Sequence, residues 1–595
     1  MPSLLPLPKR CEFKSGFLPA PSAVRLEGPD PQRVALRAGL PERHDASLTV
    51  RWRAASRLPT LHQDEAYTLR VAADGAQIDA ATIWGALHGL SSLAQLPREN
   101  GELPCCEIED APRFPWRGLM LDPARHFLSI GCLEDVLDRM WRLKLNVLHL
   151  HLTDDQGFRF ESAAYPNLAS SERYAADELR GLVAYAADRG VRIVPEIDMP
   201  GHVTSWLTAY PEWGIEPVAP SRRFGVHPGC LDVTDNEVLS AVRTLLDELM
   251  DVFPDSHVHI GGDEVAGLSA NLQNDFISEV VEHLRSSGRT PIGWDEVLHP
   301  DMPQGLTVQN WRGATTRDRA LTAGSDCIVS SGYYLDLFYP LDVHYAFDPA
   351  ASEEALIHQE DALRDDPRFA HVADGMAWTL GWRKETPLPD GRSEGRILGG
   401  EACLWGELVD EDTLPTRLWS RMPALAERFW SGVEVTDADD LRRRWPGWAL
   451  PQGEVSELLS LCEPVKWYGR LLGEVALNAR IRGQEMPQAR PYDAATPLSR
   501  PIDFLPPESW AARVVLSDDD ASLEARCTAW RAQAGSAPQE YAALFAAIGE
   551  ACDLVLSRLK GDLSADAARA ALLALYKPYG EFLPAVILHL HTRLS

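Results

Sequence analysis

The sequence predicts an α/β protein in which a (β/α)8 barrel lies between a small N-terminal α+β domain and a helical C-terminal domain. At 595 residues the chain is too long for one ordinary hydrophobic core. Between about residues 117 and 431, eight short apolar runs alternate with helix-like segments. The regions on either side have different periodicities. We therefore divide the chain into residues 1–112, 113–450 and 451–595.

The first region reads as alternating strands followed by a helix. In "AYTLRVAADGAQIDA" apolar and polar positions alternate around Asp74-Gly75, which predicts two strands joined by a tight turn. The helical stretch "TIWGALHGLSSLAQL" follows. Pro112 and Pro115 then interrupt the pattern, and we place the end of the small domain there.

The middle region carries the strand–helix repeat. Its apolar runs are "RGLMLD", "LNVLHLHL", "VRIVPEID", "HVHIGG", "PIGWDE", "LTVQNW", "DCIVSS" and "ILGGEACLW". Helical segments are predicted over 130–143, 175–189, 236–251 and 276–287. Eight such units favour a closed parallel barrel over a doubly wound open sheet.

The last region, 451–595, is predicted to be mostly helical. It contains a Pro-rich linker, "RPYDAATPLSRPIDFLPPES", and then windows such as "EYAALFAAIGEACDLVLSRL" with apolar residues at helical spacing. We find no residues in it whose pattern indicates chemistry.

Composition narrows the classes of partner. Lys and Arg number 57 against 87 Asp and Glu, a net charge of −30, which argues against nucleic acid and anionic membranes. No window approaches the roughly 18 apolar residues of a membrane span, and the N-terminus lacks a secretory signal pattern, so we expect a cytoplasmic protein. Ten scattered cysteines argue against a disulfide framework or a zinc knuckle.

Polar and aromatic side chains follow the predicted strands, where barrel enzymes carry their reactive groups. They are Arg125, Asp154, Asp198 with His202, Asp263 with Glu264, Trp294 with Asp295, Trp311, Tyr334 with Asp336, and Trp405 with Glu407. Aromatic faces cover the apolar side of a sugar ring, while carboxylates and arginine bind its hydroxyls. The set therefore predicts a carbohydrate site.

The adjacent acids of "HIGGDEV", Asp263 and Glu264, constrain the mechanism. Neighbouring residues of an extended segment point to opposite sides, so we expect these two not to flank one glycosidic bond. One would then reach the glycosidic oxygen and the other a substituent at C2. If that substituent is an acetamido group, its carbonyl oxygen can attack the anomeric carbon.

"HIGGDEV" also resembles the signature of the family 20 glycoside hydrolases, the β-N-acetylhexosaminidases, which use substrate assistance. Further blocks resemble the family in order along residues 117–407: "RGLMLDPARHF", "LNVLHLHLTDDQGFRFE", "PEIDMPGH", "GWDE", "VQNW", "YYLD" and "GGEACLWGE". The N-terminal region resembles the family's small accessory domain.

This resemblance implies an exo-acting, retaining hydrolysis of terminal N-acetylhexosaminides without a metal or cofactor. Glu264 would be the general acid and base, and Asp263 would hold the acetamido N–H and offset the oxazolinium charge. Tyr334 would donate to the acetamido oxygen. The remaining implied roles are pocket walls for Trp294, Trp311 and Trp405, hydroxyl binding for Arg125, Asp336 and Glu407, and a buried pair supporting the acid for Asp154 and His202.

Two departures from the family pattern stand out. The chain reads "VAGLSANLQ" after the acid pair, where family members commonly carry another tryptophan on the leaving-group side. Residues 337–396 are long for a barrel connection, and we interpret them as a lid or an oligomer contact; the sequence leaves the oligomeric state open, with a homodimer as one option.

Two other readings remain open from sequence. His149 with His151 and His257 with His259 have the spacing of metal ligands, although they fall within the predicted strands rather than at their ends. A non-catalytic sugar-binding module would keep the tryptophans. Chelator treatment and hydrolysis of a chromogenic N-acetyl-β-glucosaminide distinguish these readings.

Overall fold

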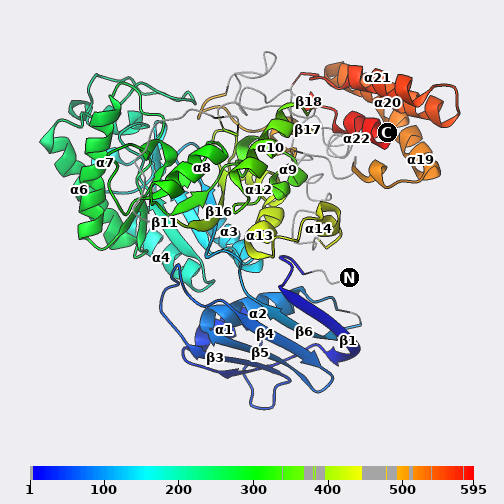
Figure 1. Cartoon of the computed structure of the whole chain (residues 1–595), viewed down its shortest axis with the longest axis horizontal. Coiled ribbons are helices and arrows are strands. Elements are labelled where there is room, and N and C mark those ends of the chain that lie inside the picture. The colour runs from blue at the N-terminus through cyan, green and yellow to red at the C-terminus, as the bar shows by residue number, and fades with distance from the viewer. Residues whose placement is uncertain are drawn as a thin grey trace.

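The computed structural model describes residues 4–98, 100–337, 339–366, 379–380, 382, 395–444, 477–478, 492–507, 513–535, 537, 539–580 and 582–594. Figure 1 shows three parts. A blue N-terminal sheet lies beneath the barrel, and the orange and red C-terminal helices lie at the far side of the barrel from α6 (Asn236–Val252) and α7 (Ala270–Ser286).

The N-terminal part is a six-stranded sheet in the order β1-β6-β4-β5-β3-β2. Its elements are β1 (Arg10–Pro19), β2 (Val24–Glu27), α1 (Pro31–Ala38), β3 (Leu48–Ala54), β4 (Tyr67–Ala72), β5 (Gly75–Thr82), α2 (Ile83–Gln95) and β6 (Glu102–Asp110). Strands β4 and β5 pair antiparallel around the Asp74-Gly75 turn. Alternate residues of β4 are buried, because one face of the sheet packs on α2, which in turn contacts the barrel helix α3 (Ile130–Arg142).

The predicted barrel is confirmed. Eight strands close in the order β11-β12-β13-β14-β15-β16-β7-β8, and every neighbouring pair is parallel. They are β7 (Trp116–Leu121), β8 (Val147–His151), β11 (Arg192–Glu196), β12 (His257–His259), β13 (Thr290–Trp294), β14 (Thr307–Asn310), β15 (Cys327–Val329) and β16 (Ile397–Leu404). Each corresponds to one of the eight apolar runs.

Helices surround this barrel. Besides α3 they are α4 (Ala176–Ala187), α5 (Thr204–Ala209), α6 (Asn236–Val252), α7 (Ala270–Ser286), α8 (Gly313–Thr322), α9 (Leu341–Ala346), α10 (Glu353–Arg364), α12 (Leu414–Trp419), α13 (Met422–Trp430) and α14 (Ala438–Arg444). The four helices predicted from periodicity are α3, α4, α6 and α7. Of the long 337–396 connection, the described part includes α9, packed on α13, and α10, packed on α8.

The barrel interior changes from apolar to polar along the strands. At the amino ends an apolar cluster fills it, closed from below by Leu61 of the N-terminal part. One level higher the inward side chains include His149, Glu196, His259 and Glu401, each at most 1% exposed. Glu196 pairs in register with His151 on one side and His259 on the other, which brings their side chains to the same level. The predicted site lies above this polar layer.

Among its described residues, the C-terminal part contains short elements and four longer helices. They are β17 (Leu477–Asn478), α17 (Pro501–Phe504), α19 (Asp520–Ala534), α20 (Ala542–Leu559), α21 (Ala565–Leu575), β18 (Phe582–Leu583) and α22 (Ala585–Arg593). Arg417 of α12 donates to the carbonyls of Ile502, Asp503 and Leu505, which fastens α17 to the barrel. The predicted division at 450/451 lies outside the described residues.

The expectations about membrane spans and disulfides can be compared with the structure. In the described part of the chain no helix is both long enough and apolar enough to cross a bilayer. The nine cysteines among the described residues are free thiols.

Candidate active site

The turn after β12 places the two adjacent acids. Gly261 and Gly262 have φ of +69° and +98°, and Glu264, which is not a glycine, has φ of +47°. A Cβ at Gly261 would come within 1.7 Å of Asp198 Oδ1, so glycine is required there on two counts. The left-handed backbone at Glu264 is costly for a residue with a side chain, and such strain concentrates at functional sites.

This turn brings both carboxylates to one histidine. His202 Nε2 lies 3.9 Å from Asp263 Oδ2 and 3.6 Å from Glu264 Oε2. The expectation that the two acids point to opposite sides is therefore wrong. It assumed an extended segment, whereas the backbone turns sharply between β12 and Glu264. The Glu264 side chain is 22% exposed and that of Asp263 11%, so Glu264 lies nearer to solvent.

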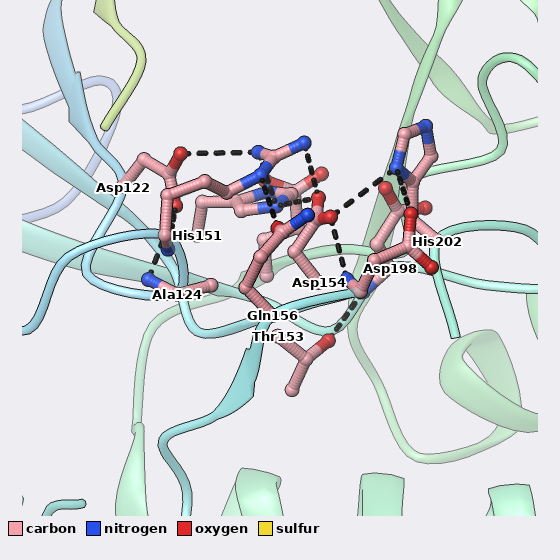
Figure 2. A network of polar contacts seen from close by, with 12 residues as sticks. Asp122, Ala124, His151, Thr153, Asp154, Gln156, Asp198 and His202 are labelled. Atoms are coloured by element: carbon pink, nitrogen blue, oxygen red, sulfur yellow. Dashed lines mark hydrogen bonds and ion pairs between the residues drawn. The ribbon is translucent and has the colours of Figure 1, made fainter. Parts of the chain in front are cut away.

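His202 connects these acids to a buried chain of charges, much of which Figure 2 shows. Its Nδ1 lies 3.3 Å from Asp154 Oδ1. Asp154 Oδ2 lies 2.6 Å from Arg125 Nη2 and 3.0 Å from His151 Nε2. His151 Nδ1 in turn lies 2.5 Å from Glu196 Oε2. This series of charged side chains therefore runs from the mouth of the barrel into its polar layer.

These contacts determine the charges of His202 and Asp154. Burial lowers the pKa of His202, but Asp154 outweighs it and raises this pKa well above its ordinary value. Burial raises the pKa of Asp154, but Arg125 and His202 outweigh it and hold this pKa well below the ordinary range. At neutral pH His202 is an imidazolium facing Asp263 and Glu264.

Asp198 is a second buried acid beside Asp263. It lies at the end of β11, accepts a hydrogen bond from the Gly262 N–H at 3.2 Å and is 1% exposed. Burial and then the charge of Asp263 raise the pKa of Asp198 well above its usual range. Burial also raises the pKa of Asp263 to about 6, against the opposing charge of His202. Two carboxylates thus share one site and resist simultaneous ionisation.

The predicted aromatic residues form one contiguous group. Trp311 and Tyr334 stack at 5.8 Å with an interplanar angle of 20°. Trp405 lies 6.3 Å from Tyr334 and 5.6 Å from Trp294. Trp294 has no exposed surface, and its indole N–H donates to Glu196 at 2.9 Å. Trp294 therefore supports this group from below, whereas Trp311 and Trp405 retain some exposure.

The residues implied in hydroxyl binding lie around Trp405. The Arg125 guanidinium sits 5.0 Å from the centre of the Trp405 ring and pairs with Asp122 at 3.0 Å. Asp336 and Glu407 line one small cavity together with Trp405. The three residues follow β7, β15 and β16, which are neighbours in the barrel.

Sequence reasoning missed the polar layer that supports this site. Glu196 contacts His149 at 3.1 Å and His259 at 2.9 Å, and Glu401 contacts His149 at 2.8 Å. Burial opposes the charge on His149, but Glu401 and Glu196 raise its pKa to about 9. The available signal was the placement of polar residues at alternate positions within apolar strand runs. The His-x-His pairs considered as metal ligands thus lie inside the barrel, where the donor atoms of His149, Glu196 and His259 are within 4.8 Å of one another.

Comparison with known proteins agrees with this geometry. Residues 114–433 match the family model "Glycosyl hydrolase family 20, catalytic domain", and residues 13–96 match "beta-acetyl hexosaminidase like". The β-hexosaminidase subunit beta of Entamoeba histolytica is 34% identical over 63% of this chain and 70% of the relative. The human subunit beta is 31% identical over 64% of this chain and 69% of its own length.

Solved structures give the same result. Flavobacterium johnsoniae chitobiase superposes with a TM-score of 0.84 at 26% identity, covering 100% of this chain and 99% of that one. A mutant Streptomyces plicatus β-hexosaminidase in complex with product GlcNAc gives a TM-score of 0.62 at 26% identity, over 74% of this chain and 93% of that one. The chain belongs to glycosyl hydrolase family 20 and is a glycoside hydrolase.

Proposed function

We propose that this protein is an exo-acting, retaining β-N-acetylhexosaminidase that releases terminal non-reducing N-acetylglucosamine or N-acetylgalactosamine by substrate-assisted catalysis. The observation that carries the proposal is the meeting of Asp263 and Glu264 on His202, beside the aromatic group. Relatives named as β-hexosaminidases, and a family structure in complex with GlcNAc, support the activity.

The glycone is bound at the β7, β15 and β16 side of the barrel mouth. Arg125 donates hydrogen bonds to its hydroxyls, Asp336 and Glu407 accept hydrogen bonds from them, and the Trp405 indole covers its apolar face. Arg125 also forms ion pairs with Asp122 and Asp154, and these three side chains close the pocket on this side of the barrel mouth. A pocket closed behind the glycone admits only the last sugar of a chain, and this supports exo action.

In the first chemical step the acetamido carbonyl oxygen of the substrate attacks C1 while the glycosidic bond breaks. Glu264 protonates the leaving oxygen. Asp263 accepts a hydrogen bond from the acetamido N–H and offsets the positive charge that develops on the oxazolinium ring. Tyr334 donates a hydrogen bond to the acetamido oxygen. Trp311 stacks against the Tyr334 ring.

In the second step water attacks C1 from the face that the aglycone left. Glu264, now a carboxylate, takes the proton from this water, and the ring opens to restore the acetamide. Two inversions give net retention. His202, held by Asp154, stays hydrogen-bonded on the protein side and keeps both carboxylates in place.

The placement of the acids supports substrate assistance over an enzyme nucleophile. A double displacement through a protein carboxylate needs its two acids on either side of the scissile bond. Asp263 and Glu264 both lie against His202 Nε2, at 3.9 Å and 3.6 Å, and Asp263 is the more buried of the two, so we assign Asp263 to the acetamido group and not to C1. The substrate's own amide is then the group that can reach C1 from the opposite face.

The test compares p-nitrophenyl N-acetyl-β-glucosaminide with p-nitrophenyl β-glucoside. We expect rapid release of nitrophenol from the first and almost none from the second. Equal rates on both would overturn the substrate-assisted mechanism, as would a glycosyl ester trapped on any side chain. Release from neither would point to a sugar-binding module.

The cytoplasmic location and the homodimer stay predictions.

A further inference from the structure

Residues 492–505 of the C-terminal part lie against the barrel. Leu498 is 5% exposed and belongs to the hydrophobic core of the barrel, and Tyr492 packs against the same core. Arg417, which donates to three carbonyls of this segment, lines a small cavity together with Glu407. The segment therefore packs on the barrel close to a residue that we assign to the glycone.

This segment also holds a loop at the mouth of the barrel. The loop, residues 221–227, lies in the connection between β11 and α6. The Ala494 N–H donates to the Arg222 carbonyl at 2.8 Å. Asp493 pairs with Arg223 as an antiparallel β-bridge. Two successive residues of the loop are thus held by two successive residues of the segment.

Gln156, labelled in Figure 2, connects this loop to Arg125. Its Nε2 donates to the Arg223 carbonyl at 2.6 Å, and its Oε1 accepts the Arg125 Nε–H at 3.1 Å. Only one orientation of the amide serves both partners, because the reverse would set two donors together at Arg125 and two acceptors together at Arg223. The position of the loop therefore determines where Gln156 holds the guanidinium.

The same loop contacts the other side of the glycone site through Phe224. The centre of the Phe224 ring lies 5.9 Å from that of His126, and His126 Nδ1 lies 2.5 Å from the Gly406 carbonyl oxygen. Gly406 stands between Trp405 and Glu407 in the sequence. The loop thus reaches the ends of both β7 and β16, which carry residues assigned to the glycone.

We propose that residues 492–505 are a structural component of the glycone site, and that Gln156 is the positioning residue through which they act on Arg125. This proposal rests on the proposed function, from which the role of Arg125 is taken. The segment holds the loop, the loop holds Gln156, and Gln156 orients the guanidinium toward the glycone hydroxyls. The C-terminal part thereby takes part in substrate binding, although the match to the family's catalytic domain ends at residue 433.

The test removes one hydrogen bond between the segment and the loop. Ala494 follows Asp493 in a turn whose Asp493 carbonyl accepts the Thr496 N–H at 2.9 Å. Proline is favoured at this position of such a turn, so Ala494→Pro should keep the turn while deleting the N–H that the Arg222 carbonyl accepts. We expect the KM for p-nitrophenyl N-acetyl-β-glucosaminide and the inhibition constant of N-acetylglucosamine to rise roughly fivefold, with a smaller change in kcat. Ala494→Ser, which keeps the N–H, should behave like the parent.

The matched control is Ala565→Pro, because Ala565 is the first residue of α21 and proline is tolerated at that position of a helix. It should leave both constants unchanged. Gln156→Met keeps the length of the side chain without its amide, and we expect a rise of roughly the same size. Since Ala494→Pro and Gln156→Met interrupt one path, their combined effect should be smaller than the product of the single effects.

Constants unchanged by both Ala494→Pro and Gln156→Met, in variants that melt like the parent, would overturn this inference alone. A combined effect equal to the product of the two would do the same. A parent enzyme that releases no nitrophenol would overturn the proposed function, and this inference with it.

Discussion

Two buried charge networks in this molecule differ in how their charges balance. The interface network joins the N-terminal part to the barrel through Glu65, His88, Asp110, Arg117 and Lys144. Arg117 pairs with Glu65 at 2.8 Å, and Lys144 pairs with Asp110 at 2.7 Å. Burial raises the pKa of Glu65, but Arg117 and His88 outweigh it and lower this pKa to about 2. Each carboxylate therefore has its own cation.

The mouth network, formed by Arg125, Asp154, His202, Asp263 and Glu264, has an excess of acids. Arg125 and His202 both lie against Asp154, which leaves Asp263 and Glu264 to share the far side of His202. The network also ends on the partly exposed Glu264, whereas the five interface side chains are at most 2% exposed. A matched network stabilises the fold, while an unmatched one that reaches solvent retains protons to exchange.

The substitution with the largest expected effect is Glu264→Gln, which removes the proton donor at the partly exposed end of the mouth network. We expect kcat/KM to fall roughly 10²–10⁴-fold for substrates with poor leaving groups, because proton donation is lost. Activated aryl glycosides should lose far less. Kinetics over a series of aglycones with different pKa values checks this, with the exposed α7 variant Glu282→Gln as the unaffected control. A loss independent of the aglycone would contradict the general-acid role.

Asp263→Asn tests the other acid of the pair. An amide retains the shape but cannot offset the oxazolinium charge, so we expect kcat/KM to fall about 10²–10³-fold. Unlike the loss in Glu264→Gln, this one should persist with activated aryl glycosides, since formation of the ring needs Asp263 whatever the leaving group. Recovery of parental rates on such substrates would argue against the amide-holding role.

Lys144→Met tests the interface network. Removing the cation leaves Asp110 buried without its ion pair, which costs about 3–5 kcal/mol in the free energy of unfolding. We expect a large drop in Tm but a normal kcat for the folded enzyme. Lys14→Met, which removes an exposed pair with Glu107, is the matched control and should leave Tm nearly unchanged. If Lys144→Met lowered kcat without lowering Tm, the division between the two networks would be wrong.

The smallest expected effect is on pH dependence. Burial raises the pKa of Asp263 to about 6 from an ordinary value of 3.8. Asp263 must be a carboxylate to hold the amide N–H, so kcat/KM should rise with pH through about 6. The folded state binds this proton more tightly than the unfolded chain, so ionisation lowers stability between about pH 3.8 and 6. A pH–rate profile flat from pH 4 to 7 would contradict this assignment.

The sequence allowed the barrel to be predicted because each strand is a short apolar run followed by a polar turn. The strand-end residues came with it, since parallel strands bring their carboxyl ends to one face. The polar layer was hidden, because Glu196 and Glu401 meet their histidines only after the barrel closes. The direction of Glu264 was misjudged for a local reason. A left-handed backbone at a glutamate has no signature in residue type.

The claim on which the mechanism depends is that the acetamido oxygen of the substrate is the nucleophile. The most direct measurement is kcat/KM for p-nitrophenyl β-glucosaminides whose N-acetyl group carries none, one, two or three fluorines. Fluorine withdraws electrons from the carbonyl oxygen while changing the size of the group little. We predict a steep fall in kcat/KM with each added fluorine. Rates that do not change across the series would show that another group attacks C1.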